Sequence, residues 1–247
     1  MKRNITSIIM IMMVCAIMFA TGCSKKEEVV ETKSKIDNTN TYKRTEIIKS
    51  AEQAKKLLIE GNKRFTSNKP AVDDISTDRK NELANNGQHP FAVIVGCSDS
   101  RVPAEIIFDQ ALGDIFVIRD AGNVVDPVAL GSVEYGVEHL GAPLIVVLGH
   151  EKCGAVKATV DGGEAPGSIG AIVNKIKPSL DKVKGTATNK EDLYTKCEDE
   201  NINNTIAEIR NSSIIKHLEE ENKVTVVGAK YDIDTGEVVF TPSSNTM

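Results

Sequence analysis

The stretch FAVIVGCSDSR occupies residues 91–101 and joins an expected strand to a run of chemically active side chains. Residues 91–96 are all apolar or glycine, which is typical of a strand buried on both faces of a parallel sheet. Residues 97–101 follow at the expected carboxyl end of that strand. Because open parallel sheets bind their ligands beyond the carboxyl ends of the strands, CSDSR is a candidate functional segment.

Four more segments have the apolar character of strands: residues 114–119, 144–148, 224–227 and, at an expected sheet edge, 237–241. Helices are expected at residues 47–65, at 128–140 and, as one helix or a pair, at 205–218. Pro103 and Pro127 suit the first turns of helices, and Asp126 suits an N-cap. This alternation predicts an α/β fold with a central, mostly parallel β-sheet flanked by helices.

The first 22 residues have the pattern of a signal peptide. A basic start precedes an apolar run at residues 5–20, which is short for a membrane span. Small residues then lead into Cys23, which resembles the lipidation site of a bacterial lipoprotein. Ala20 stands where leucine is commoner, which leaves simple secretion as an alternative to lipidation. The length of the apolar run leaves an uncleaved anchor helix as another alternative. We expect an exported protein anchored to the extracytoplasmic face of the membrane through Cys23, or a secreted one without lipidation.

The rest of the chain divides into a tether and a domain. Residues 23–44 are mostly polar and bury too little apolar surface to fold, so we interpret them as a lipidated flexible tether. Residues 45–247 are left for one globular domain with a sizeable core. The formal net charge of −5 argues against nucleic-acid binding, which favours a basic surface.

A second candidate segment is HEKC at residues 150–153, just after the expected strand at 144–148. Cys97, His150 and Cys153 together are a normal zinc set, and three protein ligands leave a fourth position open for water. Cys153 would lie at the start of the next helix, where the helix dipole favours a thiolate. A lone cysteine is more often a packing residue, so the interpretation depends on the joint pattern. We expect Cys197 to be structural or free.

The pairing of CSDSR with a later His-x-x-Cys resembles the β-class carbonic anhydrases. The likeness extends over residues 47–240 and includes EGNKRF at 60–65, RDAGN at 119–123 and VGAKYD at 227–232. The resemblance implies the fold predicted above, one Zn²⁺ per subunit, and the reversible hydration of carbon dioxide to bicarbonate and a proton. It also implies a homodimer or homotetramer, with the early helix before Asn68 packing on a partner and the site near the subunit interface.

The resemblance also implies a role for each matching residue. Cys97, His150 and Cys153 would bind zinc, Asp99 would accept a hydrogen bond from the attacking water or hydroxide, and Arg101 would hold Asp99. The implied substrate pocket consists of Gln88, Phe116, Ala121 and Tyr135. Gln88, Phe116 and Tyr135 are typical of members whose fourth zinc position holds water, whereas Ala121 stands where other members have valine. His139 matches a position proposed as a proton shuttle, with a solvated surface histidine as the equal alternative.

Two other functions remain open at the level of sequence. Relatives of this family hydrolyse carbonyl sulfide or carbon disulfide with the same zinc chemistry, and pocket shape decides between these substrates. A non-catalytic zinc-binding lipoprotein is the other alternative. Its expected mark is damage to Asp99 or Arg101, and both residues are intact.

Overall fold

The computed structural model describes residues 41–42 and 47–241. The predicted signal peptide, Cys23 and nearly all of the tether lie outside the described residues. The described residues all belong to one compact unit, Thr39–Met247. Within them, no helix is both long enough and apolar enough to cross a membrane.

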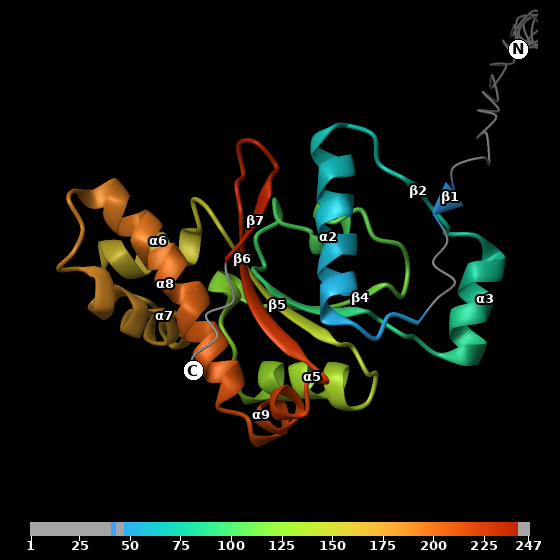
Figure 1. Cartoon of the computed structure of the whole chain (residues 1–247). Helices are drawn as coiled ribbons and strands as arrows, with labels where there is room; N and C mark the ends of the chain where they lie inside the picture. The colour runs from blue at the N-terminus through green and yellow to red at the C-terminus, as the bar shows by residue number, and fades with distance from the viewer. Residues whose placement is uncertain (1–40, 43–46, 242–247) are drawn as a thin grey trace, which may run out of the picture. The chain divides into compact units, whose positions relative to one another are not determined.

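A five-stranded sheet forms the centre of this unit, in the order β4-β3-β5-β6-β7 (Figure 1). Its strands are β3 (Ala92–Gly96), β4 (Ile115–Arg119), β5 (Leu144–His150), β6 (Thr225–Tyr231) and β7 (Val238–Phe240). The first four run parallel to one another, and β7 pairs with β6 in the antiparallel sense at the edge. The predicted α/β fold with a mostly parallel sheet and an edge strand near residue 240 is therefore confirmed. A separate parallel pairing joins β1 (Thr41–Tyr42) to β2 (Val72–Asp73).

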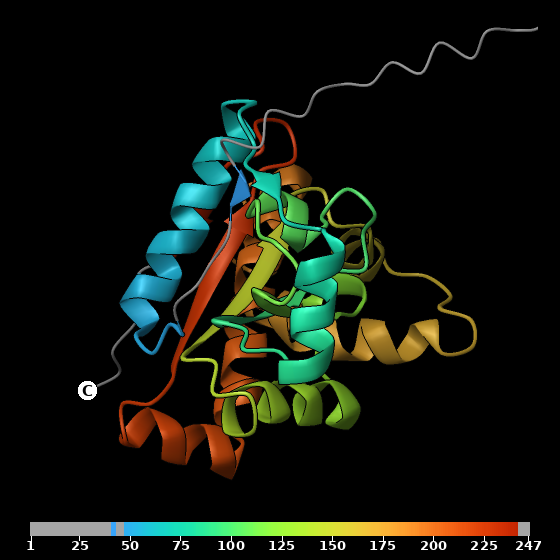
Figure 2. The same cartoon turned by 90° about the vertical axis from the view of Figure 1, so that its right-hand side faces the viewer.

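Helices cover both faces of the sheet, as Figures 1 and 2 show from two directions. Ala92 and Ile94 of β3 belong to one core cluster, together with residues of α2 (Ala51–Thr66) and α4 (Ala104–Ile107). Val93 and Val95 belong to another, together with residues of α5 (Pro127–Glu138), α8 (Lys190–Arg210) and α9 (Ser213–Glu220). Burial on both faces explains the continuous apolar run of residues 91–96.

The carboxyl ends of the parallel strands meet at one edge of the sheet, where a third core cluster lies. This cluster includes Cys97, Cys153 and Cys197 and residues of α6 (Gly154–Asp161) and α7 (Ile169–Val183). A short 3-10 turn, η2 (Ala121–Asn123), follows β4 at the same edge. The two candidate segments thus come together because β3 and β5 are neighbours.

Several helices differ from their predicted extents. The expected helix or pair at 205–218 is a pair, but α8 begins at Lys190, so Cys197 lies buried inside a helix. Asp126 caps α5 as predicted, with Pro127 in its first turn, whereas Pro103 is the N-cap of α4 and not in its first turn. α7 and α3 (Thr77–Asn86) have no counterpart among the expected elements.

Candidate metal centre

Three ligand-type side chains converge at the carboxyl edge of the sheet. Cys97 follows β3, His150 is the last residue of β5, and Cys153 is the N-cap of α6. Their ligand atoms all lie within 4.8 Å of one another, and each residue is at most 4% exposed. The two neighbouring strands therefore bring together the donor set that the sequence predicted.

The imidazole of His150 is oriented for a metal ion. Its Nδ1 lies 2.8 Å from the carbonyl oxygen of Glu151, which fixes that nitrogen as the donor. Its Nε2 is buried and has no hydrogen-bond partner among the described residues. A buried polar atom normally has a partner, so an unpaired nitrogen beside two thiol sulfurs fits a zinc ion as the missing partner.

The pKa values of the two thiols shift in opposite directions. The hydrogen bond with Cys153 lowers the pKa of Cys97 to about 4 against the opposing effect of burial, and the Gly122 and Asp99 amides contribute to this shift. The same hydrogen bond, together with burial, raises the pKa of Cys153. The Gly122 and Asp99 amide nitrogens lie 3.2 Å and 3.4 Å from Cys97 Sγ. A thiolate, the form that binds zinc, is therefore already favoured at Cys97.

Asp99 and Arg101 form a bidentate ion pair beside the ligands. Arg101 Nε and Nη2 donate to the two carboxylate oxygens of Asp99 at 2.9 Å and 2.7 Å, and the Arg101 backbone amide donates at 2.9 Å. These hydrogen bonds hold the pKa of Asp99 at about 2, well below its ordinary value. Asp99 Oδ2 lies 4.0 Å from His150 Nε2. The carboxylate thus stays ionised and close to the ligand set.

Sequence reasoning did not identify Arg119 and Gly122 individually, although both lie in the RDAGN motif. Arg119 Nε and Nη2 donate to the carbonyl oxygens of Cys97 and Asp99 at 2.9 Å and 2.6 Å. Gly122 has a φ of 74°, and a Cβ there would lie 2.7 Å from Ile176 Cδ1. Arg119 therefore fixes the backbone of the first segment, and the absence of a side chain at Gly122 lets its amide reach Cys97.

The implied pocket residues do not gather around the ligands within one chain. Ala121 does, because it precedes Gly122 in η2. Phe116 pairs with Val93 near the start of β3, and its ring packs on Tyr135 with centroids 6.2 Å apart. His139 contacts the Tyr135 ring at 5.1 Å, and Gln88 is exposed in the loop that precedes β3. These residues lie along β4, along α5 and before the amino end of β3.

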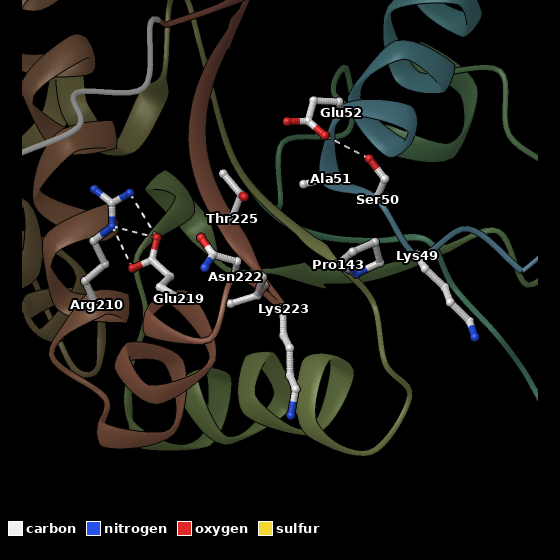
Figure 3. A pocket seen from close by; sticks show the side chains of 11 residues that line it. Lys49, Ser50, Ala51, Glu52, Pro143, Arg210, Glu219, Asn222, Lys223 and Thr225 are labelled. Carbon is white, nitrogen blue, oxygen red and sulfur yellow. Dashed lines mark hydrogen bonds and ion pairs between the residues drawn. The ribbon is translucent and has the colours of Figure 1, made fainter.

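Two hollows lie at opposite ends of the sheet. One of about 440 Å³ is lined by Cys153 and by residues of α6 and α8, including Glu198. The other, of about 470 Å³, includes Pro143 and Thr225 at the amino ends of β5 and β6 (Figure 3). Its charged groups include Arg210 and Glu219, which pair with each other. The ligand set adjoins the first hollow and lies at the far end of the strands from the second.

The fold and the donor set fit a zinc enzyme of the α/β class, in which three protein ligands would leave a fourth position for water. Residues 92–238 match the family described as carbonic anhydrase. Carbonic anhydrase 2 of Mycobacterium tuberculosis is 42% identical over 190 residues, which cover 75% of this chain and 90% of that protein. The carbonic anhydrase of Mycolicibacterium smegmatis is also 42% identical, over 74% of this chain and 89% of that protein.

Solved structures give the same result. A tetrameric β-carbonic anhydrase from Sordaria macrospora has a TM-score of 0.62 and 26% identity, over 66% of this chain and 86% of that one. The β-carbonic anhydrase CcaA has a TM-score of 0.61 and 25% identity, over 76% of this chain and 95% of that one. The chain belongs to the β-class carbonic anhydrases, which are zinc enzymes that hydrate carbon dioxide reversibly.

Proposed function

We propose that this chain hydrates carbon dioxide to bicarbonate at the Cys97, His150 and Cys153 site, with Asp99 and Arg101 as its catalytic pair. The observation that carries the proposal is the bidentate pair itself, which lies beside an unpaired His150 nitrogen. When bound, zinc supplies the Lewis acidity that makes water a nucleophile near neutral pH. Because both oxygens of Asp99 are held by Arg101, we propose that the fourth position is left to water at rest.

The role of Asp99 follows from its protonation state. An ionised carboxylate can only accept hydrogen bonds, and the pKa of Asp99 is held at about 2 by Arg101. Asp99 therefore accepts a hydrogen bond from the O–H of the attacking oxygen. This hydrogen bond turns a lone pair of that oxygen toward the carbon of carbon dioxide. Bicarbonate leaves, and one proton passes to solvent. Arg101 keeps the carboxylate oriented, and its Nη2 also donates to the Lys152 carbonyl oxygen at 3.2 Å, which ties the pair to the second ligand segment.

Stopped-flow hydration of carbon dioxide, measured together with zinc content, tests this proposal. The zinc-loaded protein is expected to hydrate carbon dioxide, and Asp99→Ala is expected to keep its zinc while losing most of the rate, roughly 100-fold or more. Near-normal turnover in Asp99→Ala would contradict the assigned role. Parallel assays with carbonyl sulfide and carbon disulfide address the alternative substrates. Consumption of either, with carbon dioxide hydrated only at the background rate, would favour that alternative.

We further propose that the substrate pocket is completed by a second copy of the chain. Phe116, Tyr135 and Gln88 match the implied pocket, yet they lie away from the ligands of their own chain. β4 is an edge strand whose side chains are only partly buried, so the surface next to it can pack against a partner. The Sordaria macrospora relative is tetrameric. A homodimer or homotetramer would bring His139 and its neighbouring aromatic residues to the partner's metal site, where His139 could transfer the proton.

We also propose that the enzyme works outside the cytoplasm, tethered to the membrane through a lipidated Cys23. The support is the sequence of residues 1–23, a basic start, an apolar run and small residues before a cysteine. Simple secretion is the alternative if Cys23 is not acylated.

A further inference from the structure

A buried ion pair lies behind the metal ligands, and the mechanism above does not use it. Glu198 of α8 is 6% exposed, and the side chain of Lys230 in β6 is 16% exposed. Glu198 Oε2 lies 3.0 Å from Lys230 Nζ, which also lies 2.8 Å from Asp199 Oδ1. Burying such a pair costs desolvation energy that the pair alone often fails to offset, so a further role for it is expected.

The second oxygen of Glu198 contacts the metal site directly. Oε1 accepts a hydrogen bond from the backbone amide of Cys153 at 3.2 Å. Cys153 is the N-cap of α6, so this amide lies outside the hydrogen-bond pattern of the helix. Glu198 therefore connects α8 and, through Lys230, β6 to the backbone of one zinc ligand.

The segment that Glu198 holds is strained. Lys152, between the two ligands His150 and Cys153, has a φ of 55°, in the left-handed region that side chains other than glycine rarely adopt. Contacts on three successive residues keep the segment in this shape. The Glu151 amide donates to the Tyr231 carbonyl oxygen at 3.0 Å, Arg101 donates to the Lys152 carbonyl oxygen, and Glu198 accepts from Cys153.

We propose that Glu198, itself held by Lys230, is a positioning residue that keeps the Cys153 thiolate in place for zinc. Without its hydrogen bond the strained segment can relax at Lys152, which moves Cys153 Sγ away from the other two ligands. Lys230 lies between the carboxylates of Glu198 and Asp199, so it offsets part of the negative charge that Glu198 would place beside the two sulfurs. The inference rests on zinc as the cofactor of the proposed function.

Transfer of zinc from the loaded full-length protein to a chromogenic chelator tests the inference without measuring turnover. Loss of an outer partner of a metal ligand typically costs about 10- to 100-fold in metal affinity, so Glu198→Ala is expected to speed zinc transfer by at least about tenfold. Glu198→Gln keeps an oxygen acceptor for the Cys153 amide and is expected to return the transfer rate to within about threefold of the wild type.

The matched control is Glu200→Ala on the same helix. Glu200 lies two residues further along and pairs with Lys182 at 2.6 Å, so its side chain points away from Glu198. This variant is expected to transfer zinc at the wild-type rate. Equal acceleration in both alanine variants, or wild-type transfer in Glu198→Ala, would overturn the proposal.

Glu198→Asp replaces Glu198→Ala in the test if the alanine variant does not fold. Aspartate keeps the buried charge, but its shorter side chain places the carboxylate further from the Cys153 amide. It is expected to speed zinc transfer by at least about threefold, and a wild-type rate in this variant would also overturn the inference. Failure of carbon dioxide hydration in a wild-type protein that holds zinc normally would count against the proposed function and leave the positioning role intact.

Discussion

Asp99 shows how one contact sets both the charge and the orientation of a side chain. Three donors from Arg101 occupy its two oxygens, and its side chain is 16% exposed. Because these donors favour the ionised form, the pKa of Asp99 falls from 3.8 to about 2. The hydrogen bonds that orient the carboxylate therefore also make the stability of the fold depend on whether Asp99 is ionised.

This linkage predicts an acid-dependent contribution to stability. A carboxyl group whose pKa is lowered in the folded state stabilises the fold above its unfolded pKa, and the contribution is lost as the pH falls through the folded pKa. Thermal unfolding of the zinc-free wild type and of zinc-free Asp99→Asn should give a Tm difference that is constant above about pH 5. The difference should shrink as the pH falls toward about 2. A Tm difference that is independent of pH over this range would show that ionisation of Asp99 does not stabilise the fold.

At this scale the sequence predicts the chemistry better than the supporting contacts. Cys97, His150 and Cys153 are predictable because they follow apolar runs and form a recognisable donor set. Gly122 and Glu198 contact the ligands only through tertiary approach, so nothing in their local sequence predicts the contacts that they make with Cys97 and Cys153. Phe116, Tyr135 and Gln88 match a family pattern, but their distance from the ligands depends on strand register.

The helix α8 explains why one long element was only partly predicted. It buries polar side chains that bind backbone groups at the carboxyl edge of the sheet. Asn201 Nδ2 donates to the Gly122 carbonyl oxygen at 2.7 Å, and Thr205 Oγ1 donates to that of Asn123 at 3.1 Å. Because these buried positions are polar, the apolar periodicity that predicts an amphipathic helix is weak before residue 205. The buried polar residues of α8 that position the site therefore weaken the hydrophobic pattern by which the helix would be predicted.

The edge formed by β4 and α5 predicts how copies of the chain meet. Val128 and Tyr135 are 78% and 45% exposed, and they lie two turns apart on one face of α5. Val128→Glu should cost a free protomer less than about 0.5 kcal/mol, since the site is exposed. In sedimentation velocity it should dissociate the oligomer toward monomers, because a carboxylate would be buried in the interface.

Ile169→Glu is the matched control for Val128→Glu. Ile169 is 52% exposed, but it opens α7, a helix that packs mainly on α6 and α8. This variant is expected to keep the wild-type oligomeric state. An unchanged sedimentation coefficient in Val128→Glu would exclude this face of α5 from the interface.

At the scale of the whole molecule, the predicted mostly parallel sheet with flanking helices is the five-stranded sheet of the described structure. The parallel direction of the strands was predictable because apolar strands alternate with helical segments. The order of the strands within the sheet was not predictable from the sequence, since tertiary packing decides that β3 lies between β4 and β5. Residues 1–40 lie outside the described structure, so the signal peptide and the anchor remain predictions from sequence.

Cell fractionation tests the lipid anchor proposed at Cys23. Cys23→Ala removes the only thiol that lipidation could use at the end of the apolar run. The variant should move from the membrane fraction to the soluble extracytoplasmic fraction, with the wild type as the membrane-bound reference. A variant that stays fully in the membrane fraction would contradict lipidation at Cys23 and favour an uncleaved anchor helix.

The origin of the ligands on two strands makes metal binding dependent on folding. His150 lies 53 positions after Cys97 (150 − 97 = 53), and the two meet because β3 and β5 are adjacent. In an unfolded chain, closing a loop of that length costs roughly 3–4 kcal/mol of conformational entropy, whereas the paired strands have already closed it. By this effect alone the folded chain binds zinc several hundred times more tightly. A chain that crosses a membrane unfolded would therefore acquire its zinc only after the sheet has formed on the far side.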